Sequence, residues 1–303
     1  MRSPMFSIIM VSLNPGDKLV ETMESVARQT YADYEVIVKD GGSQDGSLDK
    51  LREYLAGQKR LVLMEAEAGD ILQEAATGEA QSPVVRIMEQ PDHSIYEGMN
   101  QATVEARGEY LYFLNCGDGF ASETALEEAV AEISRTMGQQ AGATEEIPRI
   151  FYGDIFDSLR SQVVASNPHM DAFACYRNVP CHQACIYHYS LFSERGYEPG
   201  YRVRADYEHF LWCYFVKKVQ PQYIPVTLAA YEGGGFSETP ENRRRSAQEH
   251  REITAKYMKK GQLLKYRLIL LLTLAPLRTK MAESPAWSGI YNRCKKLLYR
   301  RDR

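Results

Sequence analysis

The sequence of 303 residues lacks the features that mark several large classes of protein. It has no excess of positive charge: the formal net charge is −4, whereas a general nucleic-acid-binding domain is usually basic. No two of the six cysteines form a C-x-x-C pair, so neither a zinc site nor a disulfide framework is expected, and the thiols should be reduced. Neither G-x-G-x-x-G nor G-K-[ST] occurs, which excludes the dinucleotide fingerprint and the Walker phosphate loop.

Long uninterrupted apolar runs are also missing. Residues 263–277 are strongly apolar, but Lys265, Arg267 and Pro276 interrupt them, and a bilayer span needs roughly 20 such residues. A strand-like run at residues 6–11 begins almost at once, with no charged segment and long apolar stretch before it, so no secretory signal is expected. We therefore expect a cytoplasmic location, at the inner face of the membrane if the C-terminal segment binds lipid.

The sequence does contain a regular alternation of strand and helix patterns over its first 120 residues. Apolar runs of strand length occupy residues 6–11, 34–39, 61–65, 84–88 and 110–114. Helical periodicity separates them at residues 17–29, from residue 47 onwards and at residues 95–107. This order predicts an α/β fold with a mostly parallel sheet flanked by helices. Ligands of such sheets bind beyond the carboxyl ends of the strands.

The second half of the chain is less regular. Strands are expected near Phe151, at residues 184–187 and at residues 223–228, and helices at about residues 206–215 and at residues 246–260, the last ended by Gly261. Residues 139–146 are expected to form a surface loop. The pattern predicts that the chain ends in a helical tail.

Three acidic motifs follow predicted strands. Asp40 begins the run DGGSQDGS directly after the strand at residues 34–39, and the glycines let a ligand approach the backbone closely. Asp92 and Asp118 follow two later strands in the same way. Carboxylates at strand ends suit a hard cation such as Mg²⁺ or Mn²⁺. Taken singly, each motif is also typical of an ordinary turn or helix start.

In this order, the motifs resemble the family-two glycosyltransferases, which are inverting enzymes of the GT-A fold. The likeness runs from residue 6 to about residue 236. Within the family, the chain resembles bacterial transferases that build surface polysaccharides. The matching pieces are Asn14 after the first strand, SVARQT from Ser25, DGGSQDGS, EQPDHSIYEGMNQA, ARGEYLYFLNCGDGF, YGD from Tyr152, PCHQA from Pro180 and ADYEHFLW from Ala205. The resemblance implies a GT-A (Rossmann-like) catalytic domain over residues 1–237, with a donor-binding half at about 1–120 and an acceptor-binding half at about 150–237. Residues 238–303 would be a helical C-terminal extension.

The resemblance also implies the donor side of a site. Asp40 would hydrogen-bond the base of a nucleotide-diphosphate sugar, and Asp92 would help to hold the nucleoside, with Asn14 and Asn115 as further donor-binding residues. Asp118 would bind a divalent cation, Mn²⁺ or Mg²⁺, as the acid of a D-x-D-like motif. The residue before Asp118 departs from the family pattern: Gly117 occupies a place often filled by another Asp.

Asp206 matches the catalytic-base position of the family. The attacking hydroxyl needs a base to take its proton, and the dipole of the following helix favours a carboxylate at its N-terminus. Contacts to acceptor or diphosphate are predicted for His182, Gln183, Glu208 and Arg243, with Glu208 as a weaker substitute for the base. The loop at residues 233–237 and the arginines after it are expected to close over the donor phosphates.

The predicted activity is that of an inverting hexosyl- or related transferase, which moves a sugar to a hydroxyl of a glycan or of a polyprenyl-diphosphate-linked acceptor. Residues 263–277 and the basic segment 292–303 suit contact with an anionic membrane surface. Packing on the catalytic domain or in a homodimer is the alternative for this tail. Two other functions remain open from the residues: a catalytically inactive nucleotide-sugar-binding module and a sugar nucleotidyltransferase. A nucleic-acid partner is not expected.

Overall fold

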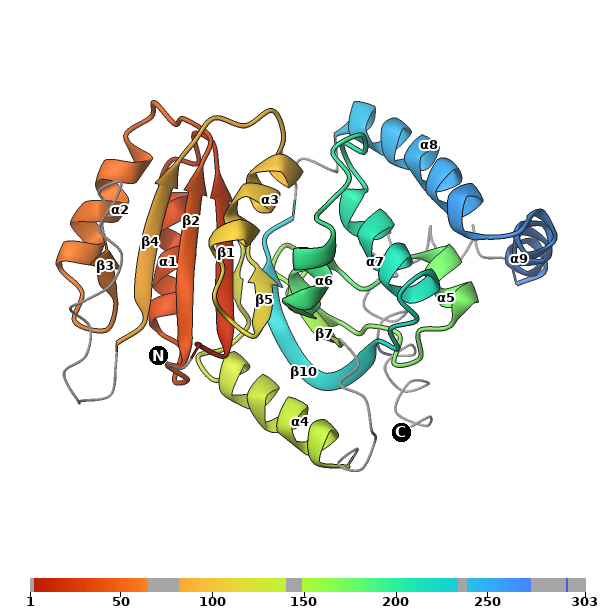
Figure 1. The fold of residues 1–303 in the computed structure, drawn as a ribbon, viewed down its shortest axis with the longest axis horizontal. Coiled ribbons are helices and arrows are strands. Elements are labelled where there is room, and N and C mark those ends of the chain that lie inside the picture. Colours follow the sequence, from red (N-terminus) through yellow and green to blue (C-terminus); the bar gives the residue numbers. More distant parts are fainter. Residues whose placement is uncertain (1–2, 65–81, 140–148, 234–238, 274–292, 294–303) are drawn as a thin grey trace.

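The computed structural model describes residues 3–64, 82–139, 149–233, 239–273 and 293 (Figure 1). Ten strands of these residues form one sheet in the order β3-β4-β2-β1-β5-β9-β7-β10-β6, with β8 paired to β7. Their bounds are β1 Phe6–Ser12, β2 Tyr34–Asp40, β3 Val62–Met64, β4 Val84–Glu89, β5 Tyr110–Phe113, β6 Gly119–Phe120, β7 Ile150–Asp157, β8 Gln162–Val164, β9 Cys185–His188 and β10 Gln222–Tyr231.

Helices cover both faces of this sheet. Their bounds are α1 Lys18–Ala27, α2 Ser47–Ala56, α3 Ile95–Glu105, α4 Ala125–Gln139, α5 Ala172–Arg177, α6 Ser190–Glu194, α7 Ala205–Phe215, α8 Pro240–Tyr257 and α9 Lys260–Leu272, with a short 3₁₀ turn at His182–Ala184. Figure 1 shows β1 to β4, from the first half of the chain, on one side of the molecule and α5 to α9, from the second half, on the other. No helix of the described residues is long and apolar enough to cross a membrane.

The alternation of side chains along β1 explains why both faces of the sheet are covered. Ile8 and Met10 point into a core that includes residues of α1, α2 and α4. Ile9 and Val11 point into a second core that includes residues of α3, α7 and α8. Because successive side chains of a strand point to opposite faces, a strand that is apolar throughout must be buried on both.

The prediction of an α/β fold with a mostly parallel sheet is confirmed. β3, β4, β2, β1 and β5 are parallel to one another, and β7 is parallel to β10. The antiparallel strand β9 lies between β5 and β7 and joins the two parallel parts. Its direction was not predictable, because an apolar run of four residues carries no information about strand orientation.

The C-terminal helices differ from the prediction in their boundaries. α8 begins six residues earlier than expected, at Pro240, where the Thr239 hydroxyl accepts the backbone N–H of Asn242 at 3.3 Å. The helix ends before Gly261, because Met258 and Lys259 adopt extended backbone angles. Gly261 lies within the first turn of α9 and is therefore not a helix terminator.

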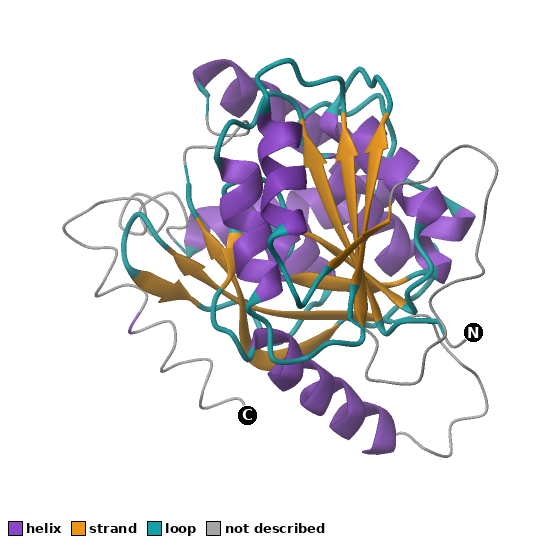
Figure 2. Cartoon of the chain, turned by 90° about the vertical axis from the view of Figure 1, so that its left-hand side faces the viewer, coloured by secondary structure: helices purple, strands orange, loops and turns teal. Residues whose placement is uncertain are grey.

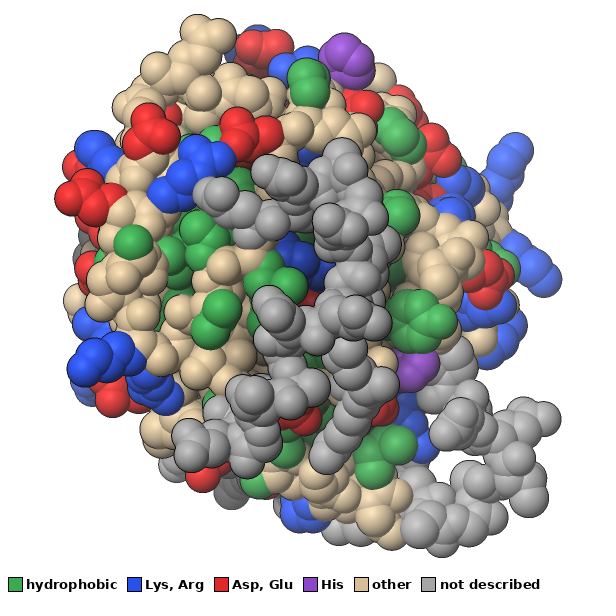
Figure 3. Space-filling view, turned by 60° about the vertical axis from the view of Figure 1, so that its left-hand side comes forward, with side chains coloured by type: hydrophobic (Ala, Val, Ile, Leu, Met, Phe, Trp, Pro, Cys, Tyr) green, Lys and Arg blue, Asp and Glu red, His purple; other side chains and the backbone are tan. Residues whose placement is uncertain are grey.

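Most of the loop expected at residues 139–146, and the tail beyond residue 273 apart from residue 293, lie outside the described residues. On the face drawn in Figure 3, Lys and Arg side chains mix with Asp and Glu around the rim, with hydrophobic side chains between them. No patch of a single sign of charge covers this face.

Candidate active site

The carboxyl ends of β1, β2, β4 and β5 meet at one edge of the sheet. Figure 2 shows the parallel strands pointing to the same edge, where loops gather. Ser12 and Asp40 are register partners at the ends of β1 and β2, and Asp40 is in turn opposite Glu89 at the end of β4. The structure thus places the predicted acidic motifs at the edge where ligands of such sheets bind.

Asp40 is completely buried and holds the loop that follows β2. Its Oδ1 accepts the backbone N–H groups of Gly42 at 2.8 Å and Ser43 at 2.6 Å, and its Oδ2 accepts the hydroxyls of Ser12 at 2.8 Å and Ser43 at 2.6 Å. Burial raises the pKa of this carboxyl, but the hydrogen bonds outweigh it and the pKa is lowered overall. Four donors fill the capacity of a carboxylate, so the predicted contact to a nucleotide base requires at least one of them to be shared.

Asn14 joins the β1–α1 and β2–α2 loops. It has a positive φ of 48°, which asparagine tolerates better than most residues. Its Oδ1 accepts the backbone N–H of Gln44 at 2.8 Å, and its own N–H donates to the Ser43 hydroxyl at 2.7 Å. Asn14 is exposed, and it therefore positions the rim of the predicted donor site.

A buried ion pair lies beside Asp40 and was not predicted. The Lys39 side chain is 0% exposed, and its ammonium contacts Oδ2 of Asp92, whose side chain is 13% exposed. The pair fits only because two glycines line it: a Cβ built at Gly41 would lie 2.9 Å from Oδ2 of Asp92, and one at Gly98 would lie 3.1 Å from it. Asp92 is thereby fixed with one oxygen on Lys39, which leaves its other oxygen for a ligand.

Asp118 lies in the turn after β5 and is nearly buried. Its Oδ2 accepts the side-chain amide of Gln183 at 2.7 Å, and its Oδ1 accepts the backbone N–H of Glu232 at 3.0 Å. The Thr22 hydroxyl from α1 donates to the backbone carbonyl of Asp118 at 2.8 Å. Burial raises the pKa of Asp118, although the hydrogen bonds from Glu232 and Gln183 oppose the rise. Three separate parts of the chain therefore hold Asp118, two through its carboxylate and one through its backbone carbonyl.

The segment from Cys181 to Gln183 connects Asp118 with Asp206. Gln183 donates to Asp118, while burial raises the pKa of the neighbouring Cys181 to about 12, and the charges of Asp118 and Asp206 add to the rise. Burial lowers the pKa of His182, and the negative charge of Asp206 opposes this. The two carboxylates therefore both lie near this short segment.

Two polar atoms near these carboxylates have no partner. Oδ1 of Asn115 and Nε2 of His182 are buried and make no hydrogen bond to the described residues. The His182 ring packs on Phe113 with 5.1 Å between centroids, and the hydroxyl of Tyr197 lies 3.4 Å from its Nδ1. A buried polar group without a partner is costly, so these two atoms mark places where a ligand would be favoured.

Asp206 occupies the first turn of α7 and is half-buried. The Tyr96 hydroxyl lies 2.9 Å from both Oδ1 of Asp206 and the Val203 carbonyl oxygen. Burial raises the pKa of Tyr96 well above its usual range, and the charge of Asp206 adds to the rise. Tyr96 therefore stays protonated and donates, with its single proton shared between two acceptors. No hydrogen bond from the described residues reaches the second oxygen of Asp206, which leaves it for a ligand.

Comparison with known proteins decides the family. The family model described as Glycosyl transferase family 2 matches residues 7–169, which is more than half of the chain and includes Asp40, Asp92 and Asp118. The chain belongs to glycosyl transferase family 2. It is therefore a glycosyltransferase, and the predicted family resemblance is confirmed.

Relatives of known sequence support the same assignment. The chain is 28% identical over 241 residues to the PGL/p-HBAD biosynthesis glycosyltransferase of Mycobacterium bovis (strain BCG), covering 79% of this chain and 81% of the relative. It is 27% identical over 237 residues to an uncharacterized glycosyltransferase of Mycobacterium tuberculosis, covering 77% of each. These matches extend beyond the region of the family model into the second half of the chain.

Solved structures of low sequence identity show the fold. The TM-score is 0.57 to Staphylococcus aureus TarS 1-349 in complex with UDP, with 14% identity, over 85% of this chain and 68% of that chain. It is 0.59 to the mannosyltransferase PcManGT from Pyrobaculum calidifontis in complex with GDP-Man and Mn²⁺, with 14% identity, over 99% of this chain and 83% of that chain. The family 2 chain thus has the GT-A fold.

Glu208 of this glycosyltransferase is bound in a way that favours a structural role. It is 0% exposed, and its carboxylate contacts Arg195 and the Tyr257 hydroxyl and accepts from Lys256 Nζ at 2.7 Å. A substrate contact, as predicted for Glu208, would require this network to open. Arg243 is exposed on the first turn of α8, and the predicted loop over the phosphates lies outside the described residues except for Gly233.

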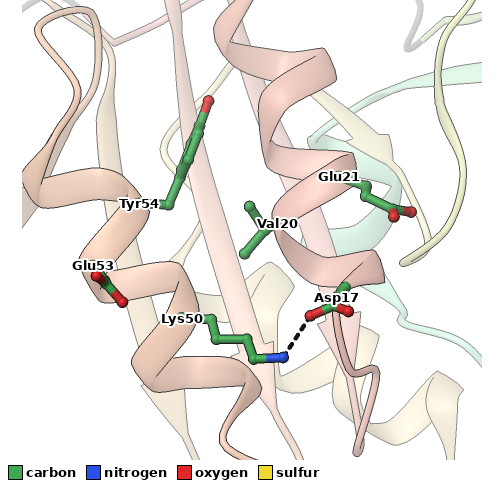
Figure 4. Close-up of a pocket in the computed structure, with 6 residues that line it drawn as sticks. All are labelled: Asp17, Val20, Glu21, Lys50, Glu53 and Tyr54. Atoms are coloured by element: carbon green, nitrogen blue, oxygen red, sulfur yellow. Dashed lines mark hydrogen bonds and ion pairs between the residues drawn. The ribbon is translucent and has the colours of Figure 1, made fainter.

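One surface pocket of the described residues lies away from these groups, and another is lined in part by Tyr197, whose hydroxyl lies 3.4 Å from Nδ1 of His182. Figure 4 shows the first, between α1 and α2, lined by Asp17, Val20, Glu21, Lys50, Glu53 and Tyr54, with Lys50 bonded to Asp17 at 2.5 Å. None of the residues predicted for the donor, cation or acceptor lines it. The candidate site is therefore defined by the strand ends and the 181–183 segment, where buried polar atoms converge.

Proposed function

We propose that this family 2 glycosyltransferase moves a sugar from a nucleoside-diphosphate donor to an acceptor hydroxyl with inversion at the anomeric carbon. The observation that carries the proposal is that Asp118 and Asp206 both lie close to the 181–183 segment: Asp118 accepts a hydrogen bond from Gln183, and the charge of Asp206 acts on Cys181 and His182. A donor diphosphate near Asp118 would bring its anomeric carbon toward Asp206. A single displacement with one base on the far side of the sugar gives inversion.

In the proposed reaction Asp206 is the general base. One of its oxygens accepts from Tyr96, and the other, which makes no hydrogen bond to the described residues, can take the proton of the attacking hydroxyl. A positioned base contributes about 10²–10⁴ in rate.

The proposed donor contacts follow the strand edge. Asp92, with one oxygen on Lys39, is suited to accept from the nucleoside with the other. Asn14 and Asp40 shape the loop against which the base would lie. The solved structures of similar fold contain UDP, UDP-GlcNAc or GDP-Man, which supports a nucleotide-sugar donor. We place His182 and Gln183 on the diphosphate and acceptor side.

The residues present fit a divalent cation. Asp118 offers a carboxylate, and the buried Oδ1 of Asn115 has no partner among the described residues. Oxygen ligands of this kind suit Mg²⁺ or Mn²⁺. The described residues contain no group of three or more His, Cys, Asp or Glu side chains placed to hold a metal ion, so the donor phosphates would complete the coordination. When bound, the cation would neutralise charge that develops on the leaving diphosphate.

The proposed acceptor is a hydroxyl of a glycan or of a polyprenyl-diphosphate-linked chain at the membrane surface, in surface-polysaccharide synthesis. Leu264, Leu268 and Leu271 of α9 are 60%, 51% and 65% exposed, at the spacing of one helix face. The opposite face is anchored, since Tyr266 packs on Phe173 and Tyr176. Anionic lipid would attract the basic residues of the tail while these leucines enter the interface.

The test is a thermal-shift screen of UDP-, GDP- and dTDP-sugars with and without Mn²⁺. A true donor stabilises the folded state by mass action. Transfer with the stabilising donor, followed by NMR of the product, then reads the anomeric configuration. Retention would contradict the single displacement, and a protein stabilised by none of these donors would contradict the donor class.

A further inference from the structure

Gly117 departs from the family pattern, and the structure shows what takes its place. It has a positive φ of 94°, and a Cβ built on it would lie 2.5 Å from Oε2 of Glu232 and 3.2 Å from Cδ of Lys18. A side chain at this position would therefore overlap the Glu232 carboxylate. Where the family often has an aspartate, this chain has the carboxylate of a residue far away in the sequence.

The sheet brings Glu232 to this position. β6 and β10 pair antiparallel, with Ala230 opposite Gly119, so the residues that follow β10 lie beside those that precede β6. The backbone N–H of Glu232 donates to Oδ1 of Asp118 at 3.0 Å across 114 positions of sequence. Glu232 is thereby fixed to the same carboxylate that is proposed to bind the cation.

The Lys18 ammonium already lies against Glu232. The Lys18 ammonium is 2.5 Å from Oε2 of Glu232, and both side chains are about half exposed, at 50% and 48%. The hydrogen bond to Glu232 raises the pKa of Lys18, and the charge of Asp118 adds to the rise. The pair is open to solvent, so Lys18 can leave Glu232 without unfolding any buried contact.

We infer that Glu232 supplies the second carboxylate of the cation site proposed for Asp118, in place of the side chain that is missing at position 117. This inference rests on the proposed function. A divalent cation bound between Asp118 and Glu232 would compete with Lys18 for Oε2 of Glu232. Lys18 would then be free to turn toward a donor diphosphate. The doubly charged ion would replace the ammonium beside Glu232, and the released ammonium would add its own positive charge near the phosphates.

The experiment measures Mn²⁺ binding and does not depend on turnover. Free Mn²⁺ is followed by electron paramagnetic resonance with the protein alone, and the Mn²⁺-dependent rise in melting temperature is measured with UDP and with GDP. Glu232→Gln keeps the backbone bond to Asp118 and removes the charge, and it is expected to weaken Mn²⁺ binding by about tenfold or more, because affinity follows the number of charged ligands. Lys18→Met is expected to tighten binding of Mn²⁺ alone, because the competing ammonium is gone.

Glu109→Gln is the matched control, because this exposed carboxylate precedes β5 at the end opposite Asp118 and should not change Mn²⁺ binding. Asp118→Asn separates the inference from the proposed function. If Asp118→Asn weakens Mn²⁺ binding and Glu232→Gln does not, the role of Glu232 is wrong and the cation site stands. If neither variant differs from the wild type, or the wild type does not respond to Mn²⁺, both the cation site at Asp118 and the role of Glu232 are wrong.

Discussion

Glu208→Gln tests whether Glu208 contacts substrate or holds the catalytic helix in place. The carboxylate is 0% exposed on α7, two residues after Asp206, and contacts two cations and one hydroxyl. Lys256 and Tyr257 belong to α8, so the carboxylate fastens α7 to α8. The glutamine is nearly isosteric, but it has no charge and presents an NH₂ group to donors.

The expected loss of stability follows from burial and partners. Removing one member of a buried ion pair costs about 3–5 kcal/mol. The side chains of Arg195 and Lys256 are 29% and 42% exposed, so they can regain water and the cost should lie near the lower value, about 3 kcal/mol. For a chain of this size each kcal/mol lowers the melting temperature by about 2–4 °C, which predicts a fall of about 6–12 °C.

The pH dependence has a definite sign. Burial raises the pKa of Glu208, but hydrogen bonds from Lys256, Tyr257 and Arg195 outweigh it, and the pKa lies below the usual 4.5. A carboxyl whose pKa is lowered by folding contributes stability above its unfolded pKa and loses it as the pH falls through the folded value. The difference between wild type and Glu208→Gln should therefore be constant near pH 7 and shrink below about pH 4.5.

Urea unfolding of both proteins between pH 4 and pH 8 measures this difference. Glu194→Gln is the control, because Glu194 forms a single partly exposed ion pair with Lys217 at 2.6 Å and should lose less than about 1 kcal/mol. If Glu208→Gln unfolds like the wild type and loses turnover or acceptor affinity, the structural role is refuted and the predicted substrate contact is supported.

The remaining predictions concern the reaction and the membrane. Asp206→Asn should lower kcat about 10²-fold or more and leave donor affinity unchanged. Tyr96→Phe should lower kcat less. A change in Asp206→Asn that is confined to KM would instead mark Asp206 as a binding residue. Asp118→Ala should remain folded and lose most turnover. If this variant keeps near-native turnover in EDTA, the proposed cation site is wrong. Leu264→Ser/Leu268→Ser/Leu271→Ser and a chain ending at residue 273 should each sediment less with anionic liposomes than the full-length chain. Added salt should weaken the electrostatic share of the full-length chain's binding. Recovery equal to that of the full-length chain would leave the tail as a packing or dimer element.

The parallel half of the fold was predictable because its strands are short apolar runs that end in recognisable turn motifs. The first strand, predicted at residues 6–11, is Phe6–Ser12, and the strand predicted at residues 34–39 is Tyr34–Asp40. A strand buried on both faces has no polar alternation to obscure it. The acids at the strand ends therefore fell on the correct edge of the sheet.

Side-chain partners at this edge were not predictable in the same way. A lysine in a strand suggests a solvent-facing residue, yet Lys39 is buried because Asp92, 53 positions later, neutralises it. Glu232 reaches Gly117 through the pairing of β6, which has two residues and no periodic signal. The contact depends on which strands are neighbours, and sequence periodicity does not specify that order.

The role of α8 changes where we propose that the catalytic unit ends. The prediction divided the chain after residue 237 and placed α8 in an extension. Glu249 of α8 is nearly buried and accepts the backbone N–H groups of residues 202, 203 and 204 at 3.0, 3.0 and 2.9 Å. These residues directly precede α7, and the carbonyl of Val203 shares the Tyr96 hydroxyl with Asp206. Because Glu249 and the Glu208 network both fix the helix that carries Asp206, a chain cut after residue 237 would lose the contacts that orient the proposed base. We therefore place the boundary after Tyr257.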